Sequence, residues 1–273
     1  MKKASEKNMT PMQPYLRLHT QNYQRIFSGE AGISHFYEFT MKTGKQEALQ
    51  AVPDGSVDLL FSIGERDVHT YIGGTVLKVK NWPMEADRLY FGVRFQPGRC
   101  KLPKDLSIQD VVNNDLEIQG DCYGNDLLSR LWEEQNLDGR ARIFTESYQN
   151  TMKDLNSLEA GQPLEKYICN RIYETKGNIS IRDLSEEMGY SECYIRRSFG
   201  KVHGISPKLF EKFVRFQNAI ERMDILLSKK GRISFDELAL ACGYYDQSHM
   251  IKEFKTFCGV TPEAYTKMMK GGV

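Results

Sequence analysis

Hydrophobic and polar positions follow two different patterns along the chain, and the pattern changes near residue 125. Before this point, short runs rich in aromatic and β-branched residues are separated by turn signals such as Pro53-Asp-Gly55. These runs predict short strands of a sandwich or small barrel, at 33–41, 57–62, 71–72, 76–79 and 89–96. After this point, apolar residues recur at spacings of three and four, which is typical of amphipathic helices.

One helical stretch occurs twice in the C-terminal half. Residues 179–191 recur as 233–246, so that Ile179, Leu184, Gly189 and Tyr190 match Ile233, Leu238, Gly243 and Tyr244 at an offset of 54. Beyond the turn, Gly204-Ile-Ser-Pro207 matches Gly259-Val-Thr-Pro262 at an offset of 55. Because the extra residue falls in the turn, where insertions are tolerated, the two stretches are predicted to be copies of one unit.

Each copy has the pattern of a helix-turn-helix. A short amphipathic helix (181–188 or 235–242) ends at a glycine, and a polar N-cap, Ser191 or Asp246, opens a second helix. The second helix is expected to bury Ile195 and Phe199, or Met250 and Phe254, on one face. Its other face carries Glu192, Cys193, Tyr194, Arg196 and Arg197 in the first copy, and Gln247, Ser248, His249, Ile251 and Lys252 in the second. Such a helix fits the DNA major groove, and Arg196 is the strongest single candidate for base contact.

The segment between the copies predicts one long helix. Ser206 is an N-cap followed by Pro207 at the first helical position, and one apolar stripe continues to Ser228. Its length is roughly 30 Å at 1.5 Å per residue. One turn of DNA is about 34 Å long, so this helix could hold two reading helices near successive major grooves.

Residues 160–270 resemble the AraC/XylS family of bacterial transcription regulators. The resemblance is closest in Ala239-Leu-Ala-Cys-Gly-Tyr-Tyr-Asp-Gln-Ser-His249, in Phe254-Lys-Thr-Phe-Cys-Gly-Val-Thr-Pro262 and in Ala264-Tyr265. It implies a seven-helix domain with two helix-turn-helix units joined by a long helix. Carried over by position, it implies base-facing roles for Cys193, Arg196, Arg197, Gln247, Ser248, His249, Ile251 and Lys252. The chain departs from the family at Glu192 and Cys193, where basic or aromatic residues are frequent, so the base preference of the first copy stays open.

The N-terminal half carries a second resemblance. Val52-Pro-Asp-Gly-Ser-Val-Asp-Leu-Leu-Phe61 and Phe91-Gly-Val-Arg-Phe-Gln-Pro-Gly98 are similar to an uncharacterised domain that precedes DNA-binding domains of this type. The resemblance covers about residues 30–120 and implies a cupin-like β-barrel sensor. The expected fold is therefore α+β, with a β-barrel or cupin-like domain and trailing helices followed by an all-α domain.

Strand alternation separates Arg94 from its apolar neighbours in the predicted strand 89–96. One interpretation pairs Arg94 with Asp58 or leaves it solvated. The other makes Arg94 the clamp for an anionic ligand, because its planar guanidinium binds carboxylates in a bidentate way. In that second interpretation the pocket walls are Tyr37, Tyr90 and Trp82.

The helical stretch after residue 125 separates two predicted domains. Leu127, Leu128, Leu131 and Trp132 form an apolar stripe, which is expected either to take part in a dimer interface or to pack on the chain's own β domain. The predicted boundaries are 1–155 for a sensor or dimerisation domain, 156–162 for a linker and 163–273 for the DNA-binding domain.

Composition and motifs narrow the class of protein. The 273 residues carry a net charge of +1, but residues 163–273 hold 18 Lys and Arg against 14 Asp and Glu, which suits DNA contact. The six cysteines lack zinc-finger spacing and are expected to be reduced, with Cys169, Cys242 and Cys258 in the core. We expect no metal, cofactor or membrane span, and the absence of nucleophile or phosphate-loop motifs argues against an enzyme.

Together these features predict a cytoplasmic, sequence-specific DNA-binding transcription regulator. Its predicted partner is double-stranded promoter DNA, and RNA polymerase, a small-molecule effector and a second copy of the chain are further candidates. Two alternatives remain from the sequence. One is a nucleic-acid module fused to a catalytic barrel, and the other is a regulator controlled by protein contacts without a ligand.

Overall fold

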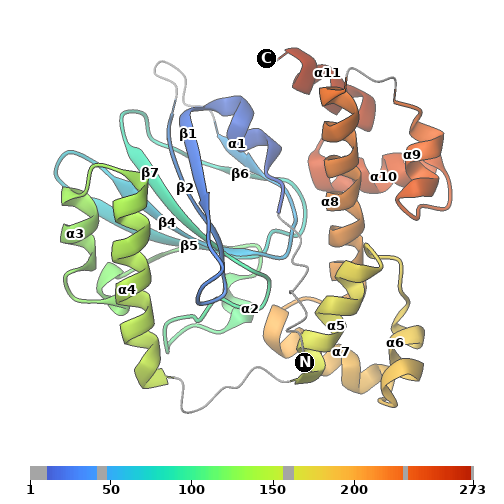
Figure 1. The fold of residues 1–273 in the computed structure, drawn as a ribbon, viewed down its shortest axis with the longest axis horizontal. Coiled ribbons are helices and arrows are strands. Elements are labelled where there is room, and N and C mark those ends of the chain that lie inside the picture. The colour runs from blue at the N-terminus through green and yellow to red at the C-terminus, as the bar shows by residue number, and fades with distance from the viewer. Residues whose placement is uncertain (1–10, 42–47, 156–162, 230–232, 272–273) are drawn as a thin grey trace.

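The computed structural model describes residues 11–41, 48–155, 163–229 and 233–271. The N-terminal part is a β-sheet with helices, and the C-terminal part is wholly helical (Figure 1). This is the predicted α+β arrangement, in which a β domain with trailing helices precedes an all-α domain. The predicted linker, 156–162, lies outside the described residues.

Six strands form one antiparallel sheet in the order β1-β2-β7-β4-β5-β8, and β3 pairs with β6 in a separate two-stranded sheet. The strands are β1 Thr20–Phe27, β2 Ile33–Met41, β3 Leu49–Ala51, β4 Val57–Ile63, β5 Val68–Gly73, β6 Lys80–Trp82, β7 Leu89–Phe95 and β8 Asp115–Ile118. Over the described residues the large sheet is open, because β1 and β8 pair on one side only. It therefore does not close into the barrel that the sequence suggested.

One predicted strand is wrong. Residues 76–79 are irregular, although Val76 is buried. Around this stretch, hydrogen bonds that involve side chains stand in place of bonds to a neighbouring strand. The Thr75 hydroxyl donates to the backbone carbonyl of Gly55, and the Leu77 backbone N–H donates to the Asn113 side chain. The β-branched and apolar residues of this stretch therefore indicate burial, but they do not indicate pairing with a neighbouring strand.

Both faces of the large sheet are covered. Helices α3 (Leu127–Glu133) and α4 (Leu137–Leu155) cover one face, where Phe36 and Phe61 of the sheet pack against Phe144. The opposite face is covered by α1 (Pro14–His19) and by the β3–β6 pair. On that face the Tyr37 ring lies over Gly92, a position where a side chain would collide with it. Two short helical segments, α2 (Ile108–Val111) and the 3-10 turn Gly120–Tyr123, lie in the connections.

The Leu127/Leu128/Leu131/Trp132 stripe packs on the chain's own sheet. Leu127 and Leu131 are fully buried in the core beneath α3, and Leu128 lies partly buried over Gly120. Trp132 is 45% exposed, and its indole N–H donates to the backbone carbonyl of Gly64 at 3.0 Å. The structure therefore agrees with the second of the two interpretations of this stripe.

Seven helices form the C-terminal part of the described chain. They are α5 Pro163–Glu174, α6 Ile181–Met188, α7 Glu192–His203, α8 Pro207–Ser228, α9 Phe235–Ala241, α10 Gln247–Cys258 and α11 Pro262–Gly271. Helix α8 has the predicted bounds, and the Ser206 hydroxyl accepts a hydrogen bond from the Leu209 backbone N–H at its start. Phe213 and Phe216 of α8 are fully buried in the core that joins the seven helices.

The sheet domain packs against α8 (Figure 1). Gly55, in the turn before β4, has a φ of +85° and lies so close to the Phe210 ring that a Cβ there would stand 2.6 Å from it. The Gln217 amide receives a hydrogen bond from the Met12 backbone N–H and donates one to the Pro53 carbonyl. Gln217 is 1% exposed, so these bonds join the two domains in a buried interface. In the described part of the chain, no helix combines the length and the apolar character that crossing a membrane requires.

Candidate nucleic-acid interface

Capping residues define the first helix-turn-helix unit. At the start of α6, Ser180 and Asp183 form a reciprocal capping box, and Gly189 ends the helix with a φ of 70°. The Ser191 hydroxyl then accepts a hydrogen bond from the Tyr194 backbone N–H and begins α7. Since each signal is local in the sequence, the turn forms where the sequence predicts it.

The second unit uses the same devices with different residues. Ser234 caps α9, and Gly243 stands in the turn with a φ of 79°. The Asp246 carboxylate accepts a 2.7 Å hydrogen bond from the His249 backbone N–H and begins α10. Its negative charge is also favourable at the positive end of the helix dipole.

Each second helix buries one face and exposes the other. Ile195 and Phe199 of α7, and Met250 and Phe254 of α10, are fully buried as predicted. The predicted DNA-facing residues are exposed at Cys193, Tyr194, Arg196, Arg197, Ser248, His249 and Lys252, and partly exposed at Gln247 and Ile251. Their exposure leaves them available to DNA, and their roles in contacting it stay predictions.

A buried ion pair anchors α10 to α8. Arg215 donates from Nη2 to both carboxylate oxygens of Glu253 at 3.0 Å, and its guanidinium lies 4.8 Å from the centre of the Tyr244 ring. Arg215 and Glu253 are 8% and 7% exposed. Because the pair is shielded from water and hydrogen-bonded in a bidentate way, it fixes α10, the predicted DNA-reading helix of the second unit, to α8.

The two units also contact each other around the α8 scaffold. Asn178, just before α6, packs on Gly243 in the turn of the second unit and donates to the Cys242 carbonyl. Gly177 has a φ of 78° and lies against the backbone of α8 at Glu211 and Arg215, where a Cβ would collide. A side chain at Gly243 would therefore push the two units apart, and one at Gly177 would push the segment before α6 away from α8.

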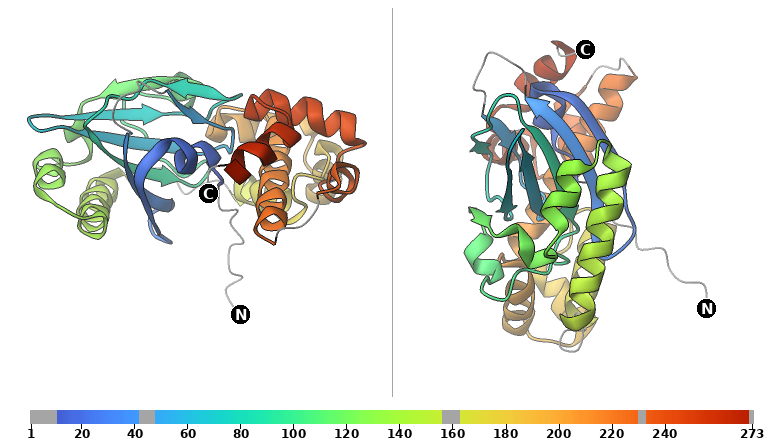
Figure 2. Two further views of the ribbon diagram at one scale, coloured as in Figure 1. Left: turned by 90° about the horizontal axis from the view of Figure 1, so that it is seen from above. Right: turned by 90° about the vertical axis from the view of Figure 1, so that its left-hand side faces the viewer.

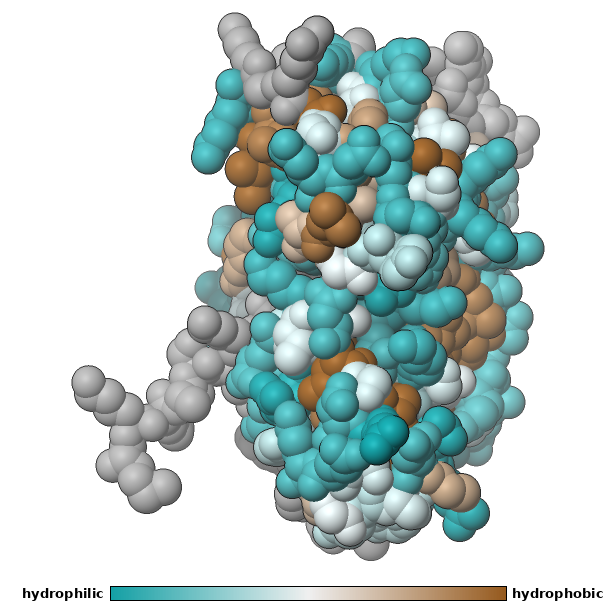
Figure 3. Space-filling model, turned by 90° about the vertical axis from the view of Figure 1, so that its right-hand side faces the viewer, coloured by the Kyte–Doolittle hydropathy of each residue, from teal (hydrophilic) through white to brown (hydrophobic). Residues whose placement is uncertain are grey.

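The two reading helices have corresponding contacts with the sheet domain. Gly204, which caps α7, packs on Val112, and Gly259, which caps α10, packs on Val79. The C-terminal ends of α7 and α10 thus touch the sheet domain, whereas the exposed predicted readers lie nearer the N-terminal ends. Helices α6 and α9 lie on the side of α8 away from the sheet (Figures 1 and 2). That side is mostly hydrophilic, with small separate hydrophobic patches (Figure 3).

Some surface features of the interface were not predicted. Arg196 is paired with Glu192 at 2.5 Å across one turn of α7, so its guanidinium already has a carboxylate partner. Tyr190 stacks on Tyr194 with 5.2 Å between ring centres. Tyr245, the extra residue in the second turn, is 87% exposed. The sequence did contain a sign of this exposed ring. Tyr245 is an insertion in a turn, and an inserted aromatic residue at such a position does not belong to the core that the two copies share.

The predicted ligand pocket on the inner face of the sheet is occupied by the protein's own side chains. Arg94 is bound by Asp58 and Asp54, which agrees with the ion-pair interpretation. Tyr37 and Tyr90 are 3% exposed, and both join a stacked aromatic row through Phe39. Trp82 lies over Gly73 of β5, where a side chain would collide. Anion binding by Arg94 would require displacement of a carboxylate, and it stays a prediction.

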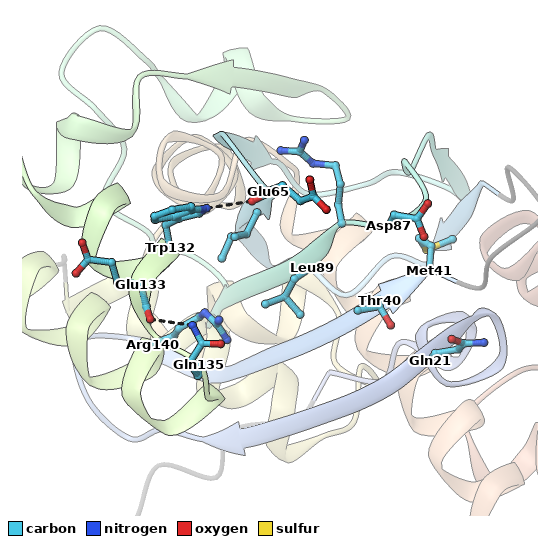
Figure 4. Close-up of a pocket in the computed structure, with 13 residues that line it drawn as sticks. Gln21, Thr40, Met41, Glu65, Asp87, Leu89, Trp132, Glu133, Gln135 and Arg140 are labelled. Atoms are coloured by element: carbon cyan, nitrogen blue, oxygen red, sulfur yellow. Dashed lines mark hydrogen bonds between the residues drawn. The ribbon is translucent and has the colours of Figure 1, made fainter.

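An open groove lies at another edge of the sheet, beside α3 (Figure 4). Its lining includes Trp132, Leu89 and Met41 together with Arg88 and Arg140. Both arginines have partners: Arg88 donates to Ser62 and pairs with Asp67, and Arg140 pairs with Glu38 and donates to the carbonyls of Leu131 and Glu134. The lining also includes the exposed carboxylates Glu65, Asp87 and Glu133, so the groove presents apolar surface, paired arginines and acidic side chains.

Two family matches correspond to the two structural parts. Residues 184–268 match a helix-turn-helix domain, and residues 30–117 match a domain of unknown function (DUF6597). The chain is 35% identical over 97 residues to the uncharacterized HTH-type transcriptional regulator YbfI of Bacillus subtilis (strain 168). That stretch covers 35% of this chain and 33% of the relative, so the match spans a third of YbfI.

The solved structures that match this chain include ToxT from Vibrio cholerae O395. It is 12% identical, with a TM-score of 0.45, and the similarity covers 91% of this chain and 98% of ToxT. The C-terminal domain of AraT, a response regulator from Geobacillus stearothermophilus, is 22% identical with a TM-score of 0.35. In that comparison 40% of this chain and 88% of the AraT domain are covered.

Proposed function

The C-terminal part of this chain is an AraC-type helix-turn-helix domain, and from this premise we propose that the protein binds double-stranded DNA and regulates transcription. The observation that carries the proposal is the pair of matched units on one helix. Helix α8 has 22 residues, about 33 Å at 1.5 Å per residue. This length is close to one turn of DNA, so α7 and α10 can enter successive major grooves on one side of the duplex.

The exposed residues of α7 and α10 divide into two chemical roles. Arg196 and Arg197 can donate two hydrogen bonds to guanine or neutralise phosphates. Gln247 suits adenine, because its amide both donates and accepts. Lys252 lies farther along α10 and suits a phosphate, as a point charge without a fixed fork. Base contacts supply specificity, and phosphate contacts supply position and salt dependence.

Selection of bound sequences from random DNA, followed by footprinting, tests this proposal. Arg196→Ala should lose about 1–3 kcal/mol at one base position and relax preference there. Lys252→Ala should weaken binding evenly across sequences and reduce the salt dependence. The two effects should lie in half-sites about one DNA turn apart. Arg130→Ala removes an equal charge from α3 in the sheet domain and should leave binding unchanged.

Two results would contradict the two-reader arrangement. One is wild-type affinity of both Arg196→Ala and Lys252→Ala for the selected DNA. The other is a disturbance of the same half-site by both variants. Failure of the wild-type protein to enrich any sequence would contradict sequence-specific binding itself.

We also propose that the sheet domain transmits a signal to the reading helices, because it touches the C-terminal caps of both. A small molecule bound in the groove beside Trp132 is the proposed signal. The chain has two tryptophans, so Trp82→Phe leaves Trp132 as the reporter. An effector should change its fluorescence and alter DNA affinity. If no compound changes the Trp132 fluorescence and only a protein partner alters DNA affinity, the result would support control without a ligand. RNA polymerase and a second copy of the chain stay predicted partners.

A further inference from the structure

Three side chains of different chemistry converge beside the first helix-turn-helix unit, where α5 meets the end of α7. Glu165 and Cys169 lie one turn apart on α5, and His203 is the last residue of α7. Glu165 Oε1 is 2.6 Å from His203 Nε2 and 3.2 Å from Cys169 Sγ, and the sulfur is 3.4 Å from the same nitrogen. Glu165 is 1%, Cys169 6% and His203 2% exposed. None of these residues belongs to the predicted DNA-reading surface.

The positions of the three donor atoms suit a metal ion. Zinc binds sulfur at about 2.3 Å and nitrogen or oxygen at about 2.0–2.2 Å, so tetrahedral geometry places the ligand atoms about 3.3–3.6 Å apart. Two sides of the triangle already have nearly this length. The third, between Glu165 and His203, has to open by less than about 1 Å, which side-chain rotation on two separate helices can supply.

The chemistry of the three donors selects the kind of ion. A thiolate and an imidazole are ligands of zinc and of similar transition metals, whereas magnesium and calcium take oxygen ligands. A thiol is a weak hydrogen-bonding group, so Cys169 contributes little as a hydrogen-bond partner of Glu165. The buried Glu165 carboxylate is bonded to His203 Nε2, and a divalent cation would take over that compensation and also stabilise a Cys169 thiolate.

The surroundings orient the imidazole by stacking. The His203 ring lies 4.0 Å from the Phe199 ring, centre to centre, and the two planes differ by 11°. Gly98 of the sheet domain approaches the same ring so closely that a Cβ there would be 3.0 Å from Nε2. His203 Nδ1 is buried and has no hydrogen-bond partner among the described residues. Aromatic packing therefore takes the place of the hydrogen bond that usually orients a metal-bound histidine.

We propose that Glu165, Cys169 and His203 form a binding site for a single divalent ion of the zinc type, with a fourth position for water. Coordination displaces the Cys169 thiol proton to solvent, and His203 binds through Nε2 as the tautomer whose proton lies on Nδ1. Glu165 lies in the first turn of α5, so opening of one helical turn admits the ion. The bound ion joins α5 to the end of α7 that touches Gly98. Occupancy therefore stabilises the first reading helix where it meets the sheet domain.

Titration of the metal-free full chain with Co²⁺ tests the site, because thiolate-bound cobalt has an intense near-ultraviolet band and four-coordinate cobalt has strong visible bands. We expect one Co²⁺ per chain, displacement by Zn²⁺ and a higher melting temperature with either ion. Cys169→Ser should abolish the near-ultraviolet band. His203→Gln should weaken binding at least about tenfold, which is the loss that even outer-shell partners can cause.

Matched variants separate this site from the other thiols. Cys193→Ser removes the exposed thiol of α7, and Cys100→Ser removes a partly exposed thiol of the sheet domain, so both should keep the cobalt spectrum. Glu165→Gln keeps the shape of the side chain and should also weaken Co²⁺ binding at least about tenfold. This variant therefore decides the outcome if Cys169→Ser does not fold. The proposal is overturned if folded wild type gives no thiolate band, if Glu165→Gln binds like wild type, or if Cys193→Ser or Cys100→Ser removes the band.

Discussion

Arg94 donates hydrogen bonds from Nε and Nη2 to the two carboxylate oxygens of Asp58, which lies 36 positions earlier on the neighbouring strand β4. Its Nη1 donates to Asp54 at 2.7 Å, and Gln13 donates to the same Asp54 oxygen. Burial raises the pKa of Asp58, and the charge of Arg94 opposes that rise. The guanidinium therefore ties Asp54, in the turn that packs on α8, to Asp58 of strand β4.

Arg94→Met should destabilise the protein by about 3–5 kcal/mol, because two buried carboxylates lose their partner. Urea unfolding would measure the loss. Arg130→Met removes an arginine from an exposed pair with Glu146 and should cost less than about 1 kcal/mol. If Arg94→Met unfolds like the Arg130 variant, the ion pair is not structural and the anion-clamp hypothesis gains support.

Tyr15→Phe should weaken the contact between the two domains. The Tyr15 hydroxyl donates to the Cys258 carbonyl at 2.7 Å across the interface, and Tyr15 is 1% exposed. Its loss leaves a buried carbonyl unsatisfied, which costs about 1–3 kcal/mol. The free energy of unfolding measures this. Tyr167→Phe removes an exposed hydroxyl that bonds Glu187 and should change it little. Equal effects of the two variants would count against a structural role for the Tyr15 bond.

Glu192→Gln should strengthen DNA binding. The Glu192 carboxylate holds Arg196 at 2.5 Å and would repel a phosphate, so its neutralisation frees Arg196 at a gain of up to about 1 kcal/mol. Glu186→Gln is a matched control, because Glu186 pairs with Arg182 at the same spacing on α6, away from the reading helix. Binding isotherms on the selected DNA would show the difference. An unchanged or weaker affinity for Glu192→Gln would show that Arg196 does not face DNA.

Acid should destabilise the sheet domain through His35. Burial lowers the pKa of His35 from 6.5 to about 3, with the charges of Arg94 and Arg25 adding to the effect. The unfolded chain takes up this proton below pH 6.5 and the folded chain does not, so stability is lost as the pH falls from about 6.5 towards 3. The slope from this group is at most about 1.4 kcal/mol per pH unit. In His35→Gln this part of the slope should disappear from denaturant curves collected between pH 7 and 4. An identical pH dependence in the variant and wild type would rule out His35 as the source.

Much of the helical domain could be predicted from the sequence, because its signals are local. Ser191, Asp246 and Ser206 cap helices within three residues of themselves, and an apolar stripe over α8 needs no knowledge of a distant segment. The repeat strengthened the helix-turn-helix prediction, because the same turn pattern occurs at matching positions in two copies. The α+β order, both turns and the exposure of the reading face follow from such signals.

Tertiary structure alone decided the features that join distant segments. Strand signals did not show that the sheet stays open, because pairing depends on which edges meet and not on residue type. Asp54 and Asp58 reach Arg94 across 40 and 36 positions, and Glu165 meets His203 across 38. At such separations, a contact depends on how whole elements pack. The sequence by itself therefore determined the reading units, and packing determined the domain interface, the choice between the two interpretations of Arg94 and the buried Glu165–Cys169–His203 cluster.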